Sequence, residues 1–151
     1  MKKIILVFAY LIICSCGKLQ CLAQNSGAKV AIEEFYTGYC RILENRPRFL
    51  PANLLYERID SLAQKYCTKR IRNEAKEYFA DGHDLYTNDY GIISESLKSL
   101  SIKVDVHKNN KFIVNYYTIN YDANRNPVKQ KVFLFISVIK VKDKYRINDV
   151  R

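Results

Sequence analysis

The sequence contains few of the residues on which recognisable catalytic motifs depend. Among its 151 residues there is no Trp, and there are only two His and five Gly. It therefore holds no Gly-rich loop for a phosphate group, no Gly-x-Ser-x-Gly nucleophile motif and no zinc-protease histidine pair. Nothing in it predicts a cofactor, and the lack of internal repeats excludes solenoid proteins.

Long apolar runs are also missing, apart from one at the start of the chain. Lys2 and Lys3 precede an uninterrupted apolar stretch from Ile4 to Ile13. A stretch of this length cannot span a bilayer, which requires roughly twenty residues. A short positive segment followed by a short apolar one is typical of a signal peptide, so we expect the protein to be exported.

The end of this signal has two interpretations. The stretch Ile13-Cys14-Ser15-Cys16-Gly17 resembles a bacterial lipobox, which predicts a signal over residues 1–15 and a lipid on Cys16. The alternative is cleavage after Ala23, with a signal over residues 1–23, which leaves an even number of cysteines. We favour the lipoprotein. No acidic cluster follows Cys16, so an anchored protein is expected to face the periplasm.

The composition of the rest of the chain is that of one small folded domain. Hydrophobic residues make up 48% of the sequence, which excludes wholesale disorder. Charged residues make up 26%, which excludes a protein with several membrane spans. We expect a polar tether over residues 24–27 and a single domain over residues 28–151.

Apolar residues recur at helical spacing through the first half of this domain. The first stripe ends at a Pro-bearing break over residues 46–48, the second follows Pro51, and the third follows Thr68, which suits a helix N-cap. Residues 81–90 have no period and many turn formers, so they are predicted to form a loop. The three stripes are Ile32, Phe35/Tyr36, Tyr39 and Leu43; Leu55, Ile59, Leu62 and Tyr66; and Ile71, Ala75 and Tyr78/Phe79.

From Leu100 onward the spacing of apolar residues changes to two. Strands are predicted over residues 100–106, 112–121, 132–141 and 145–150. The third of these is almost continuously apolar, as expected of a central strand covered on both faces. Helices followed by an antiparallel meander indicate an α+β fold, with the helices packed on one face of the sheet.

Positive charge is concentrated in the predicted sheet. Residues 24–100 hold 11 basic and 11 acidic side chains, whereas residues 101–151 hold 11 basic and 4 acidic ones, a net charge of +7. Lysines on exposed strands discourage edge pairing. They also suit an acidic partner, such as an anionic envelope polymer, a lipid headgroup or an acidic protein. Nucleic acid is disfavoured, because an exported protein meets little of it.

Four short stretches of the domain carry a family resemblance. They are Ala31-Ile32-Glu33-Glu34-Phe35-Tyr36 with Tyr39, Cys67-Thr68-Lys69-Arg70-Ile71, the acidic loop from Asp81 to Tyr90, and Tyr145-Arg146-Ile147-Asn148-Asp149-Val150. Together with the order of the predicted elements, they resemble the nuclear transport factor 2-like superfamily. More narrowly, they resemble the domain of unknown function family 3828, which is common in Gram-negative envelopes of the Bacteroides type. The resemblance extends over roughly residues 28–151.

This resemblance implies a curved antiparallel sheet wrapped around helices, forming a cone with an open pocket. It also implies that the acidic loop helps to define the pocket mouth, and that Tyr145 occupies a position where the family often has Trp. We therefore take Asp84, Asp89, Tyr145 and Asp149 as candidate ligand-binding residues. The resemblance implies no reaction, since this fold hosts enzymes and binding proteins alike.

Asp149 is the best candidate for a general acid or base. It alternates with Ile147 and Tyr145 on the last predicted strand, which predicts that it faces the core, where a carboxylate must be paired or line a cavity. The alternative is a structural ion pair or cap with an Arg or a helix terminus. The loop over residues 81–90 mixes His with carboxylates but has no known metal-binding spacing, so no metal site is predicted.

Cys40 and Cys67 have two interpretations: a disulfide that clamps two helices, or two buried thiols. Taken together, the sequence favours a non-catalytic, exported domain that binds a small ligand or an envelope protein, with an acidic partner preferred. The alternatives are a pocket hydrolase or isomerase that uses Asp149, and an envelope immunity or inhibitor protein. Membrane contact is expected only through a lipid on Cys16.

Overall fold

The computed structural model describes residues 25–105, 108 and 110–151. The predicted export signal and Cys16 therefore lie outside the described residues. A first helix occupies residues 25–44, so residues 25–27 belong to a helix rather than to the predicted tether. The reason is packing: Gly27 lies so close to the ring of Tyr145 that a Cβ there would come within 2.5 Å of it.

Three more helices follow in the described part of the chain: α2 (Ala52–Tyr66), α3 (Lys69–Ala80) and the short α4 (Ser94–Lys98). The first helix, α2 and α3 confirm the three apolar stripes. We did not predict α4, because five residues are too few to display a helical period. Among the described residues, no helix is long and apolar enough to cross a membrane.

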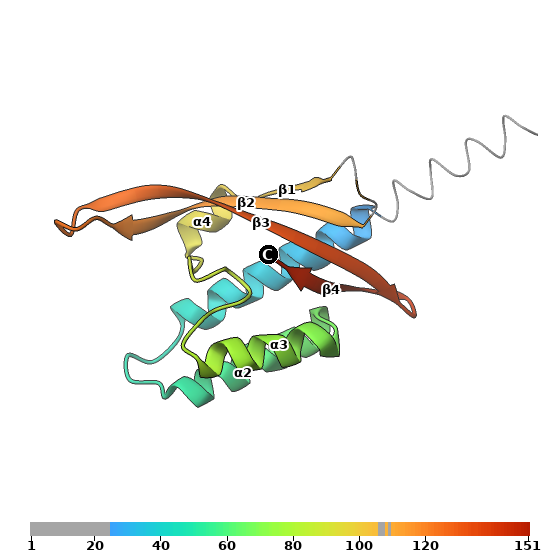
Figure 1. Ribbon diagram of the computed structural model, residues 1–151, viewed down its shortest axis with the longest axis horizontal. Helices are drawn as coiled ribbons and strands as arrows, with labels where there is room; N and C mark the ends of the chain where they lie inside the picture. Colours follow the sequence, from blue (N-terminus) through green and yellow to red (C-terminus); the bar gives the residue numbers. More distant parts are fainter. Residues whose placement is uncertain (1–24, 106–107, 109) are drawn as a thin grey trace, which may run out of the picture.

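The second half of the chain forms one antiparallel sheet in the order β1-β2-β3-β4. The strands are β1 (Ser101–Val104), β2 (Lys111–Tyr121), β3 (Pro127–Val141) and β4 (Lys144–Val150). The sheet curves over the helices, and β2 and β3 form a long hairpin that extends beyond them (Figure 1). The structure therefore confirms the predicted α+β fold.

Aromatic side chains join the first helix to the rest of the core. The rings of Phe35 and Tyr36 are fully buried, and the ring centroid of Phe35 lies 5.1 Å from that of Tyr86 in the loop after α3. The Tyr36 hydroxyl donates a hydrogen bond to the Tyr86 carbonyl oxygen at 2.8 Å. From the sheet, the Tyr116 hydroxyl donates to the carbonyl oxygen of Gly91 at 3.0 Å. Helix, loop and sheet thus share one core.

The described helices cover only one face of β3, so among the described residues the prediction of a strand covered on both faces is wrong. Val132, Leu134 and Ile136 point into the core, whereas the intervening Phe133 and Phe135 are 50% and 54% exposed. The strand is apolar on both sides because its second face carries exposed aromatic rings, over which none of the described residues forms a second layer.

A β-bulge in β4 changes which residues face the core. Ser137 of β3 pairs with Asp149 and the next residue of β3 pairs with Ile147, so Asn148 is the extra residue. Ile147 and Val150 are consequently both buried. Asp149 pairs with Ser137 of β3 and is not one of the buried core residues, although its carboxylate lies within 3.2 Å of Arg70 on α3.

A Phe→Ala substitution should lower the free energy of unfolding far more in the core than on the uncovered face of the sheet. Phe35→Ala should lower the free energy of unfolding by about 3–5 kcal/mol, because it leaves a cavity in the aromatic core. Phe133→Ala, at a half-exposed position, should cost less than about 1 kcal/mol. Urea denaturation of both variants measures this difference. Equal costs would contradict the assignment of the two faces.

Candidate functional site

The four residues predicted to bind a ligand do not form one site. Asp84 and Asp89 lie in the loop that follows α3, whereas Tyr145 and Asp149 lie on β4. Asp149 contacts Arg70 at the start of α3, whose 12 residues separate that end from the loop by about 18 Å. The predicted pocket mouth and the predicted acid or base are therefore at opposite ends of one helix.

In the loop, Asp84 serves to hold the backbone. Its carboxylate accepts hydrogen bonds from the Tyr86 amide at 3.0 Å and from the hydroxyl of the buried Thr87. Burial raises the pKa of Asp84, and these hydrogen bonds oppose that rise. Thr87 in turn accepts a hydrogen bond from the Gly91 amide at 3.0 Å. The Tyr86 amide and the Thr87 hydroxyl thus bind the Asp84 carboxylate within the loop.

Asp89 contacts two residues near the start of the same loop. Its carboxylate accepts the Asp84 amide at 2.5 Å and lies 2.9 Å from Nδ1 of His83, and these contacts lower the pKa of Asp89. The cavity lined by Asp84 and His83 measures only about 10 Å³, which is room for about one water molecule. No group of three His, Cys, Asp or Glu side chains among the described residues could hold a metal ion.

Asp149 forms the structural ion pair that was the alternative to an acid–base role. Its carboxylate lies 3.2 Å from a guanidinium nitrogen of Arg70 and 3.0 Å from one of Arg151. Arg70 also donates to the carbonyl oxygen of Asn148, in the bulge. These contacts fasten the edge strand β4 to α3. They provide no nucleophile or second titratable partner for Asp149.

Tyr145 does line a sizeable groove, between the first helix, α2 and β4. The groove measures about 620 Å³, and Glu34, Lys65, Tyr66 and Arg146 also line it. One of these cations is already engaged, since Arg146 donates to the carbonyl oxygen of Gln64 at 2.7 Å. The groove therefore combines one acidic side chain, that of Glu34, with the basic side chains of Lys65 and Arg146.

Cys40 and Cys67 are two free, buried thiols. The predicted disulfide is therefore not formed, and the alternative of two separate thiols is the one observed. Burial raises the pKa of Cys67 to about 12 and also raises the pKa of Cys40, so neither is suited to act as a nucleophile.

Alkylation distinguishes free thiols from a disulfide without a structure. In the native protein, iodoacetamide should modify both thiols slowly, because they are buried and protonated. In denaturant without reductant, peptide mapping should find both Cys40 and Cys67 alkylated. If both residues were modified only after a reductant is added, the free-thiol assignment would be wrong.

The most distinctive surface of the molecule is the sheet face that no described helix covers, which we call the outer face. Its apolar side chains come from the two central strands and are half-exposed. Lysines from three strands accompany them. The outer face consists of Ile113, Tyr117 and Ile119 of β2, Phe133, Phe135 and Ile139 of β3, and Lys103, Lys111, Lys129 and Lys131.

Lysines and rings on the outer face contact one another. Lys129 places its Nζ 4.5 Å from the centroid of the Tyr117 ring, and Lys131 places its Nζ 4.9 Å from that of Phe133. Such cation–π contacts contribute about 0.5–1 kcal/mol each at exposed sites. Asp149 is the only acidic residue within the four described strands, and two arginines already pair with it. The outer face is thus both apolar and basic.

The sequence carries one signal for this face that the strand prediction missed. Lys129, Lys131, Phe133 and Phe135 alternate with a strict period of two. The lysines show which side of β3 faces water, and the rings that follow at the same spacing must lie on that side. Because the residues between the rings are also apolar, the alternation is hidden in the second half of the strand.

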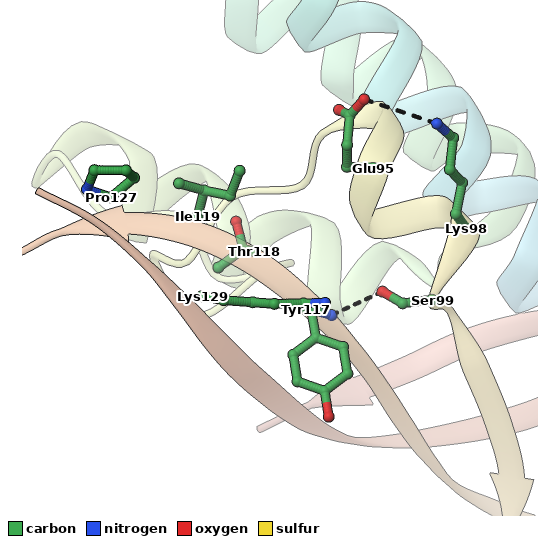
Figure 2. Close-up of a pocket in the computed structure, with 8 residues that line it drawn as sticks. All are labelled: Glu95, Lys98, Ser99, Tyr117, Thr118, Ile119, Pro127 and Lys129. Carbon is green, nitrogen blue, oxygen red and sulfur yellow. Dashed lines mark hydrogen bonds and ion pairs between the residues drawn. The ribbon is translucent and has the colours of Figure 1, made fainter.

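A groove of about 470 Å³ lies at one margin of the outer face, between α4 and the β2–β3 hairpin. Glu95 and Lys98 project from α4, and Thr118, Ile119 and Pro127 come from the hairpin (Figure 2). The Glu95 carboxylate lies 3.9 Å from Nζ of Lys98. The groove is mostly apolar, with its charges at the rim.

Comparisons with known proteins support the fold and leave the activity open. No family model matches the chain, and no curated protein matches it. A crystal structure of a protein of unknown function from Bacteroides thetaiotaomicron VPI-5482 is similar, with a TM-score of 0.73 and 20% sequence identity. The match covers 91% of this chain and 98% of that one. The likeness shows a shared α+β fold.

Proposed function

We propose that this chain is a non-catalytic binding domain of the bacterial envelope that docks an acidic protein on its outer face. The observation that carries the proposal is the uncovered layer of aromatic and aliphatic side chains, with Lys129 and Lys131 lying over its rings. Exposed apolar patches of this kind mark interaction surfaces. Export through the predicted signal and a lipid on Cys16 belong to the same proposal.

A protein suits this surface better than a charged polymer does. Interfaces between proteins are enriched in aromatic residues at their centre and carry charge at their rim. On the outer face, Lys131 lies over the ring of Phe133 and Lys129 lies over that of Tyr117, so lysines and rings share one surface. A polyanion would use the lysines and leave the rings in water, whereas an acidic protein can cover both.

The geometry gives less support to the pocket enzyme. Asp149 is held by Arg70 and Arg151, and the cavity beside Asp84 is too small for a substrate. An immunity or inhibitor protein is one form that a partner-binding domain can take. A cone-shaped fold of the nuclear transport factor 2-like kind is compatible with helices on one face of a curved sheet, and it stays part of the proposal.

A double variant of the outer face tests the proposal. Lys131→Glu with Phe135→Ser should lower the capture of the partner from envelope extracts by at least roughly tenfold, because it removes an aromatic anchor and reverses a charge. The wild-type capture should also weaken when salt is raised from about 0.05 M to about 0.5 M, which screens exposed charges.

The matched control changes one Lys and one aromatic residue on α3. Lys76 and Tyr78 are exposed there, so Lys76→Glu with Tyr78→Ser makes a similar change in charge and ring content away from the sheet. This control should capture the partner as the wild type does. If both double variants reduced capture equally, the outer face would not be the docking surface.

A further inference from the structure

In the part of the chain that the structure describes, no strand pairs with the edge of β2 beyond the end of β1. β1 pairs with β2 only from Phe112 to Asn115, whereas β2 continues to Tyr121. On its other side, β2 pairs with β3 along its whole length. The last part of β2 is therefore an edge strand, with one row of backbone groups directed away from the sheet.

The direction of these backbone groups follows from the contact of Tyr117. Its amide donates a hydrogen bond to the Ser99 hydroxyl at 2.9 Å, on the side away from β3 (Figure 2). Amides and carbonyls of alternate residues in a strand point to the same side. Those of Ile119 and Tyr121 are thus directed to the open edge as well.

The groove between α4 and the hairpin lies along this same edge. Thr118 and Ile119 form one wall, α4 forms the other with Glu95 and Lys98, and the volume is about 470 Å³. A helix facing an open strand edge across an apolar groove is the geometry in which extended peptides join a sheet as an added strand. Backbone pairing would supply affinity, and side chains would supply selectivity.

The charged side chains that line the groove indicate what kind of peptide segment it can bind. Lys98 and Lys129 line the groove, and the one acidic lining residue, Glu95, is near enough to Lys98 to form an ion pair. Lys131 follows Lys129 on the outer face. A second copy of this chain would bring the same lysines together, so an edge-to-edge dimer is disfavoured. An acidic segment is attracted to the groove.

We propose that the groove between α4 and the open edge of β2 binds an extended segment of alternating aliphatic and acidic residues as a fifth strand. This rests on the proposed function, because it names the form of partner segment that extends the outer face. The segment would pair with the backbone of Ile119 and Tyr121 and place its carboxylates near Lys98 and Lys129.

The test uses a fluorescent peptide of alternating Val and Asp residues and the full-length chain. Ile119→Pro removes the amide that faces the open edge, and proline is tolerated at such edge positions. Ile119→Ala, the matched control, shortens the side chain but keeps that amide. Fluorescence anisotropy should show roughly tenfold weaker binding for the proline variant and less than about threefold for the alanine variant. A Val-Lys peptide should bind more weakly than the Val-Asp peptide by at least roughly tenfold.

Hydrogen exchange on the wild type gives a second measurement that does not depend on any variant. Adding the Val-Asp peptide should slow exchange at the amides of Ile119 and Tyr121. No binding up to about 1 mM peptide, or equal affinities of the two variants, would overturn the proposal. A dimer that Ile119→Pro converts to monomer would also overturn it, because a second copy would then occupy the edge.

These outcomes are distinct from failure of the proposed function. The Lys131→Glu and Phe135→Ser variant tests the outer face through capture of the protein partner. Ile119→Pro tests the edge through a defined peptide. If the wild-type chain bound no Val-Asp peptide while capture of the protein partner still depended on Lys131 and Phe135, strand addition would be overturned and the outer face would remain the docking surface.

Discussion

The rings of Phe35 and Tyr36 lie on one face of the first helix and hold the sheet and the loop after α3 together. All the described helices lie on one side of the sheet, so the described residues bury only one of its faces (Figure 1). Everything on the other face, including Phe133 and Phe135, is left accessible. The outer face is therefore a consequence of how the core is assembled.

Local contacts hold two parts of the chain against this core: the loop over residues 81–90 and the strand β4. Asp84 and Asp89 hold the loop through backbone amides, and Asp149 ties β4 to α3 through Arg70. In all three cases a carboxylate has its own partners within the fold. The three acidic residues that the sequence marks as candidates for a site therefore have structural roles. The outer face, in contrast, exposes aromatic rings and lysines.

The sequence was sufficient to predict three helices, four strands and their order, because each apolar stripe has a clear period. It could not predict the bulge at Asn148, which breaks the alternation of Asp149 with Ile147 and Tyr145, since an extra residue in a strand leaves no mark on composition. It also could not show which face of β3 is covered, because both faces are apolar there. The candidate site shifted from acidic residues to the outer face for these two reasons.

The central claim is that the outer face, and not the groove at Tyr145, contacts the partner. The most direct measurement is photo-crosslinking in cells, with benzoylphenylalanine placed at Phe133, at Tyr145 or at the exposed Tyr78 of α3. We predict one crosslinked adduct with an acidic protein from position 133 and none from the other two positions. An adduct from position 145 with none from position 133 would contradict the account.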